Sequence, residues 1–196
     1  LIDAVTGFAR AEGAVLLHGE RIDRLKAHVR VRRGLARTFQ SLELYDDLTV
    51  HENVSAALFG TARKHRPGQV DAALERVGLS ELEEREAGEI SQGERQLVSI
   101  ARACACEPTV LLLDEPAAGL GPKDTEQLGE RIRAIAASGT AVLLVDHDIG
   151  LVLDVCDYIY VLDFGQILVE GDAEAIRNDK AFAEAYLGTL HQVAAS

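Results

Sequence analysis

The amino-acid sequence predicts an α/β fold built on a mostly parallel sheet with helices on both faces. Two short segments, 110–113 and 141–145, are apolar at every residue, which is typical of strands buried on both sides in a parallel sheet. Between them, residues 122–137 have the spacing of an amphipathic helix. Because strand, helix and strand alternate, we expect a right-handed crossover that joins two parallel strands.

Glycine, proline and capping residues mark the other elements. Pro67-Gly68 breaks a helical stretch, and Ser91 followed by Glu94 is a capping-box pattern that opens another helix. Asp163-Phe164-Gly165 has the composition of a hairpin turn. We expect a helix tail at 1–8, a strand at 14–17, helices at 50–60, 69–77, 91–106, 149–156, 173–178 and 180–187, and an antiparallel β element formed by 158–162 and 166–169.

The composition is that of a folded globular domain with an acidic surface. The chain has 196 residues, of which 47% are hydrophobic and 27% charged, and its formal net charge is −12 at pH 7. The length and apolar content suffice for a buried core. The negative charge argues against nucleic acid as the main partner, because phosphate backbones bind clustered Lys and Arg. No apolar run approaches the roughly 18 residues of a membrane-spanning helix.

Basic residues are concentrated in the first 40 positions, whereas the rest of the chain is acidic. We expect these basic side chains to form the solvated face of a helix. The alternative is a surface near anionic lipid or a phosphate group. The residues concerned are Arg21, Arg24, Lys26, Arg30, Arg32, Arg33 and Arg37.

Polar side chains with catalytic potential follow the two predicted buried strands. Asp114 and Glu115 end the first strand and His147 follows the second, and ligands of parallel sheets bind beyond the carboxyl ends of the strands. One carboxylate can hold Mg²⁺ and the other can deprotonate an attacking water, while an imidazole can donate to a terminal phosphate. The alternative is two satisfied acids in a loop and a core histidine.

The segment 90–96 is a second candidate site. A Ser and a Gly at a helix N-terminus leave backbone N–H groups and a hydroxyl free to bind an anion. Taken alone, this pattern is better explained by an ordinary capped helix.

Together, these segments resemble the nucleotide-binding subunit of ABC transporters. Ser91-Gln92-Gly93-Glu94 is similar to the LSGGQ signature, and 110–116 is similar to the Walker B strand followed by the catalytic Glu. Ala118-Gly119-Leu120-Gly121 resembles the D-loop, His147 the switch histidine, and Arg37-Thr38-Phe39-Gln40 the Q-loop. The resemblance implies a P-loop NTPase-like sheet, with ATP and Mg²⁺ as cofactors.

The resemblance also implies a role for each matching residue. Catalytic roles fall to Glu115, which activates water, and His147, which senses the γ-phosphate. Mg²⁺ is positioned by Asp114 and Gln40. The residues expected to bind nucleotide are Gln40, Ser91, Gln92, Gly93, Glu94, Gly119 and Gly121, of which Ser91 and Gly93 would serve the nucleotide of a paired subunit.

The subfamily suggested by the resemblance is the ATPase of branched-chain amino-acid importers, on the segments 5–8, 37–40, 115–120 and 185–188. It implies three partners: a second ABC ATPase subunit in a homo- or heterodimer, membrane permease subunits and, indirectly, a substrate-binding protein. We expect residues 41–106 to form a helical subdomain that docks on the permease. The protein would then lie peripherally on the cytoplasmic face of the inner or plasma membrane, with no nucleic-acid partner.

The sequence departs from the family pattern at several places. No Gly-x-x-x-x-Gly-Lys-Ser/Thr occurs in the 196 residues, and 1–8 resembles the helix that follows this Walker A loop. We therefore expect 1–196 to be a single ABC ATPase domain that is N-terminally incomplete and inactive by itself. Gln92 replaces a signature Gly, Glu94 replaces the signature Gln, and Gly121 replaces the D-loop Asp.

Two other functions remain open. A degenerate, non-catalytic cassette would explain the missing Walker A pattern, but Asp114, Glu115 and His147 argue against it. A soluble ABC ATPase that acts on DNA or the ribosome usually carries coiled-coil insertions or duplicated cassettes, and neither fits this chain.

Overall fold

A computed structural model describes residues 1–39, 42–59 and 66–184. The chain separates into two compact units, Leu1–His147 and Asp148–Ser196, and each is described by itself. Gln40, predicted to contact Mg²⁺ and nucleotide, lies outside the described residues. So does segment 185–188, part of the subfamily resemblance.

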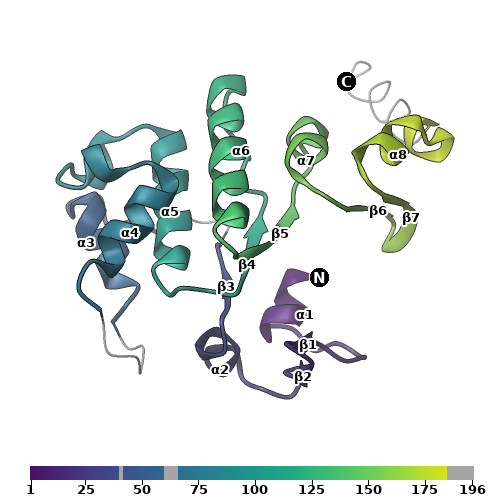
Figure 1. The fold of residues 1–196 in the computed structure, drawn as a ribbon, viewed down its shortest axis with the longest axis horizontal. Helices are drawn as coiled ribbons and strands as arrows, with labels where there is room; N and C mark the ends of the chain where they lie inside the picture. The colour runs from purple at the N-terminus through teal and green to yellow at the C-terminus, as the bar shows by residue number, and fades with distance from the viewer. Residues whose placement is uncertain (40–41, 60–65, 185–196) are drawn as a thin grey trace. The chain divides into compact units, whose positions relative to one another are not determined.

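The first unit is organised around a three-stranded parallel sheet (Figure 1). Its strands are β3 (Leu35–Arg37), β4 (Val110–Asp114) and β5 (Ala141–Val145), in the order β3-β4-β5. Leu112 at the centre of β4 pairs with Arg37 on one side and with Leu143 on the other. The predicted parallel sheet is therefore confirmed.

The two apolar strands differ in burial. Leu111, Leu112 and Leu113 of β4 are at most 1% exposed, as expected for a central strand. β5 is only half-buried at its centre, and Val145 is 37% exposed. The expectation of burial on both faces is wrong for β5, which lies at the edge of the described sheet and is at most half-buried along its length.

Helices cover both faces of β4. Side chains alternate between the two faces of a strand, and Leu112 joins a core cluster with Ile2 of helix α1 (Ile2–Thr6). The opposite face carries α6 (Pro122–Ala137), the crossover helix between β4 and β5, which packs on β5. Pro122 at the first helical position suits its fixed φ angle. The helix buries its predicted apolar side chains Leu128, Ile132 and Ile135.

Three further helices of the first unit pack against one another: α3 (Val50–Ala56), α4 (Gln69–Val77) and α5 (Gln92–Cys104). Both α3 and α5 begin with a complete capping box, Thr49 with Glu52 and Ser91 with Glu94, so the capping prediction is confirmed. Short 3-10 turns, η1 (Ser80–Leu82) and η2 (Ala87–Glu89), connect α4 to α5.

The N-terminal segment contains α1, the antiparallel pair β1 (Leu16–Leu17) and β2 (Glu20–Arg21), and α2 (Ala27–Arg32). Arg30 of α2 is only 4% exposed and donates to the carbonyl oxygens of Ala4 and Val5, at the end of α1. A helix end leaves such carbonyls without partners. The prediction of a solvated face is therefore wrong for Arg30.

The second unit begins with α7 (Ile149–Val155) and continues as a hairpin of β6 (Ile159–Asp163) and β7 (Gln166–Gly171), followed by α8 (Ala173–Asn178). The predicted antiparallel element is confirmed, with a bulge between Val161 and Leu162. Asp148 and Asp172 cap α7 and α8 with their side chains. No helix in the described part of the chain is long and apolar enough to cross a membrane.

Candidate functional site

The acidic pair and the histidine lie at neighbouring strand ends of the first unit. Asp114 ends β4 in register with Val145 of β5. The next backbone N–H, of Glu115, donates to the carbonyl oxygen of Val145 over 2.7 Å. The Nδ1 atom of His147 lies 3.9 Å from Oε2 of Glu115 and 3.7 Å from Oδ1 of Asp146. Parallel pairing thus places an imidazole beside a carboxylate distant in sequence.

Glu115 and His147 are open to solvent. The side chain of Glu115 is 42% exposed and that of His147 is 74% exposed. The backbone of Glu115 has φ of 47°, a left-handed conformation that costs a non-glycine residue of order 1–3 kcal/mol and is frequent at functional sites. The strained turn and the exposed acid leave this strand end accessible to a ligand.

Two polar residues of this region, Asp146 and Arg37, were not among the predicted site residues. Asp146 has a fully buried side chain, which accepts from the backbone N–H of Ala117 at 3.0 Å. Asp146 directly precedes His147, so this hydrogen bond links the start of the segment that carries His147 to the turn after Glu115. Arg37 places Nη2 3.4 Å from Oδ2 of Asp114. The sequence signal available for Asp146 was an acidic residue between an apolar run and a candidate histidine.

The second candidate segment opens helix α5. The Ser91 hydroxyl accepts from the N–H of Glu94 at 3.3 Å, and a carboxylate oxygen of Glu94 accepts from the N–H of Ser91 at 2.7 Å. Both side chains are therefore used by the helix itself. Gln92 lies in the first turn and is not among the residues with positive φ, so this position does not require the backbone freedom of glycine.

Glycines near the starts of α5 and α6 have different physical roles. A Cβ at Gly93 would lie 3.0 Å from the carboxyl carbon of Asp124, so the close approach of α6 explains this glycine. Gly119 has φ of 77°, and the left-handed backbone explains it. Gly121 caps α6 with an ordinary extended backbone and no side-chain bond. This geometry does not require glycine at position 121.

The profile of the family described as "ABC transporter" matches residues 1–118, more than half of the chain. The chain belongs to the ABC transporter family. Members of this family are ATPases that bind ATP, normally with Mg²⁺, and they work as dimers with membrane permease subunits.

Two curated relatives of this ABC protein are named for different cargoes, and one of them is named for export. The chain is 36% identical to the "high-affinity branched-chain amino acid transport ATP-binding protein BraF" of Pseudomonas aeruginosa, over 96% of this chain and 81% of that protein. It is 34% identical to the "lipopolysaccharide export system ATP-binding protein LptB" of Haemophilus influenzae, over 94% of this chain and 78% of that protein. Transport direction is therefore not decided by similarity alone.

A solved structure confirms the fold of the ABC cassette. The ADP conformation of MJ1267, described as an ATP-binding cassette of an ABC transporter, matches with a TM-score of 0.84 and 31% identity, over 95% of this chain and 82% of that chain. The α/β architecture with its parallel sheet and antiparallel strand pairs is that of an ABC ATPase.

The residues at the strand ends suit a magnesium ion that arrives with a nucleotide. No group of three or more His, Cys, Asp or Glu side chains that could hold a metal occurs among the described residues. Mg²⁺ in nucleotide sites typically takes only one or two carboxylates, with waters and phosphate oxygens as the other ligands. The partly exposed carboxylate of Asp114 is a donor of this kind.

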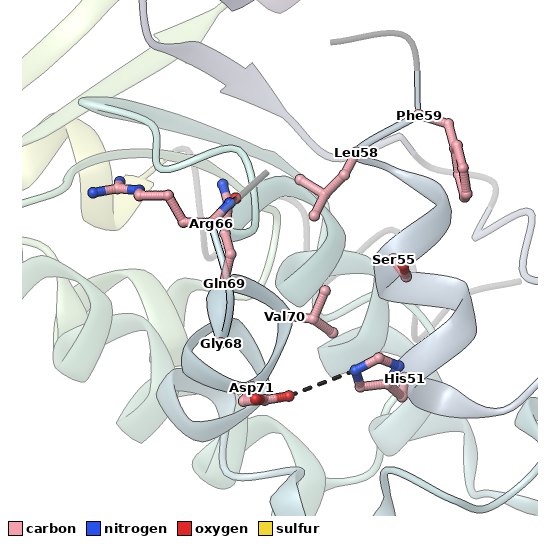
Figure 2. Close-up of a pocket in the computed structure, with 9 residues that line it drawn as sticks. All are labelled: His51, Ser55, Leu58, Phe59, Arg66, Gly68, Gln69, Val70 and Asp71. Carbon is pink, nitrogen blue, oxygen red and sulfur yellow. Dashed lines mark hydrogen bonds and ion pairs between the residues drawn. The ribbon is translucent and has the colours of Figure 1, made fainter. Parts of the chain in front are cut away.

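A separate pocket of about 250 Å³ lies among the helices α3 and α4 (Figure 2). Leu58, Phe59 and Val70 provide an apolar part, and Phe59 is 80% exposed. His51 and Asp71 form a polar edge, with Nε2 3.5 Å from Oδ1. This pocket was not predicted from the sequence, because its residues come from two segments separated along the chain.

Proposed function

We propose that this chain is the ATP-binding and ATP-hydrolysing subunit of an ABC importer for branched-chain or other amino acids. The observation that carries the proposal is the pairing of Glu115 with His147, 3.9 Å apart at neighbouring strand ends and next to Asp114. The similarity to BraF supports the choice of cargo class.

Each strand-end residue has a distinct chemical task in this proposal. Glu115 orients and deprotonates the attacking water, because an exposed carboxylate can accept its proton. His147 donates a hydrogen bond to the γ-phosphate, and its contact with Glu115 keeps the two groups on the same reacting centre. Asp114, together with Gln40, would hold Mg²⁺, which neutralises phosphate charge when bound.

The start of α5 and the loop before α6 would act on the nucleotide of a second subunit. Ser91, Gln92, Gly93 and Glu94 open a helix whose first N–H groups and dipole favour a phosphate. Gly119 and Gly121 belong to the loop that resembles the D-loop. Because Gly93 approaches Asp124 of α6 closely, the starts of α5 and α6 are packed together and would move as one body.

The chain by itself would not hydrolyse ATP. No Walker A pattern occurs in the 196 residues, and without such a loop the β- and γ-phosphates lose their main backbone cradle. Activity would require a form of the subunit that contains a Walker A loop, called the intact subunit below. If instead the intact subunit is a degenerate cassette, it will show no ATPase activity even when assembled with a permease.

Residues 41–106 would form the helical subdomain that contacts the permease, and we place the contact at the pocket of Figure 2. The exposed ring of Phe59 and the apolar side chain of Val70 offer a surface for a short permease segment. ATP-driven closure of two subunits would then move the permease. The protein would act peripherally at the cytoplasmic face of the membrane.

Reconstitution tests both the activity and the direction of transport. The intact subunit is assembled with its permease in vesicles, and uptake of labelled leucine is measured with ATP on the side of the ATPase. We expect ATP-dependent accumulation that also requires a substrate-binding protein. Movement of lipid or another cargo in the opposite direction, as the similarity to LptB allows, would contradict the importer proposal.

A further inference from the structure

Arg37, the last residue of β3, is held tightly at the strand ends although none of the proposed roles uses it. Its side chain is only 10% exposed. Nη1 donates to Oδ1 of Asp3 at 2.5 Å and to Oγ1 of Thr6 at 3.2 Å, both on α1. Nε donates to the carbonyl oxygen of Thr38 at 3.3 Å. The guanidinium is therefore fixed by groups outside the reacting centre.

Two aromatic rings complete this arrangement. The guanidinium carbon lies 4.7 Å from the ring centre of Phe39 and 5.6 Å from that of Phe8. The rings contact each other edge to face, with centres 6.0 Å apart. A cation over aromatic faces is attracted by their electron density. Phe39 directly precedes Gln40, so Arg37 also anchors the beginning of the segment that resembles the Q-loop.

The remaining guanidinium nitrogen is directed at Asp114. Nη2 lies 3.4 Å from Oδ2 of that carboxylate. Within the described ranges, no other side chain is recorded in a hydrogen bond or ion pair with Asp114. The second oxygen, Oδ1, thus keeps its full acceptor capacity there.

The charges in this cluster allow Arg37 to orient the carboxylate of Asp114 without neutralising its charge. Asp3 is the nearest anion to Arg37, at 2.5 Å, whereas the contact with Asp114 is 3.4 Å. Since Asp3 already balances the guanidinium charge, Arg37 can hold one oxygen of Asp114 while the carboxylate remains attractive to a cation.

We propose that Arg37 is a positioning residue that orients the carboxylate of Asp114 for a divalent cation and links it to α1. This inference rests on the proposed role of Asp114 in nucleotide hydrolysis. Carboxylates that bind metals are commonly held by such a second partner, and its loss costs roughly 10–100-fold in metal affinity or activity.

The test replaces Arg37 in the intact subunit and measures metal dependence in two ways. Mn²⁺ binding in the presence of ATP is followed by electron paramagnetic resonance, and ATPase rates are recorded against Mg²⁺ concentration. For Arg37→Met we expect the half-saturating metal concentration to rise about tenfold. Arg37→Lys should recover part of the loss, because it restores one cationic donor but not the planar fork. Arg33→Met, which breaks an exposed pair with Glu20, is the matched control.

A double-mutant cycle with Asp3 separates orientation from packing. Asp3→Asn removes the charge that balances Arg37, so the guanidinium should draw Asp114 more strongly and raise the half-saturating metal concentration. In the Arg37→Met background the same change should have no further effect, because both act through one guanidinium.

Three outcomes would overturn the inference. An unchanged metal dependence in folded Arg37→Met would leave Arg37 with a packing role only, and a lower half-saturating concentration would show that it opposes the cation. If Asp114→Asn also keeps normal metal dependence, the proposed role of Asp114 fails and the inference fails with it. If Asp114→Asn loses metal dependence while Arg37→Met does not, only the inference fails.

Discussion

The strand ends and the start of α5 use polar residues in opposite ways. Glu115 and His147 are exposed, and at Glu115 the backbone is strained. At the start of α5, Ser91 and Glu94 satisfy each other's backbone N–H groups in a capping box on an ordinary helix. The first region offers side-chain chemistry to a ligand, whereas the second offers a rigid backbone shape. Substitutions should therefore affect rate in one region and assembly or stability in the other.

The largest effect is expected for Ser91→Arg in the intact subunit. A long cationic side chain at the start of α5 would fill the space through which a partner's nucleotide approaches, and it removes the capping hydroxyl. We expect ATPase activity to fall to background while the monomer still binds a fluorescent ATP analogue. Ser138→Arg, an exposed change at the C-terminal end of α6, is the control, since positive charge is favourable there. Equal loss of binding and turnover in Ser91→Arg would contradict the assignment to a partner's site.

Glu115→Gln should slow hydrolysis by roughly 10²–10⁴-fold, the usual contribution of a general base. The amide keeps the size of the side chain, so ATP binding should persist. Steady-state ATPase rates and equilibrium binding of the analogue check both halves of this expectation. Glu130→Gln, on the exposed surface of α6, should change neither quantity. Near-normal turnover of Glu115→Gln would remove the base from the proposed mechanism.

Phe59→Asp is expected to weaken assembly with the permease without changing ATP binding by the isolated subunit. A charge on the exposed apolar ring position would have to be desolvated on docking. Co-purification with the permease should fall by at least about tenfold, as expected for a lost aromatic anchor. Tyr158→Asp alters an exposed aromatic residue of the second unit, 53% exposed against 80% for Phe59, and serves as the comparison. Unaltered co-purification of Phe59→Asp would exclude the pocket of Figure 2 as the contact.

The smallest effect concerns stability at the start of α5. Glu94→Ala removes one half of the capping box, and we expect a loss of about 1 kcal/mol in the free energy of unfolding. Chemical denaturation of the intact subunit measures it, with Glu89→Ala, an exposed acid in η2, as reference. A large fall in ATPase rate without a change in stability would mean that Glu94 contacts the nucleotide directly and does not serve only to cap α5.

Regular patterns made much of the fold predictable from sequence. The bounds of α4, α6 and β5 agree with the expected 69–77, 122–137 and 141–145, because each shows a clear apolar period or run, with proline or glycine marking α4 and α6. The closeness of Glu115 and His147 was foreseen from the rule that parallel strands end at the same edge of a sheet.

The missed features depend on contacts between distant parts of the chain. Arg30 caps α1, and Arg37 joins Asp3 to Asp114. A long flexible side chain gives no sequence signal for its partner, so the sequence placed both in a basic cluster, and Arg37 also in the segment that resembles the Q-loop, without indicating these contacts. The partial exposure of β5 depends on which elements cover its faces, which an apolar run does not encode.

Because the backbone of Glu115 is left-handed, stability and the proposed activity favour different residues at this position. Glycine adopts φ near 47° without steric penalty, so Glu115→Gly should make the folded protein more resistant to heat, provided that the gain exceeds the entropy which glycine adds to the unfolded chain. The same change would remove the carboxylate. If Glu115 is the general base, as proposed, the same substitution would give a more heat-resistant protein that no longer hydrolyses ATP.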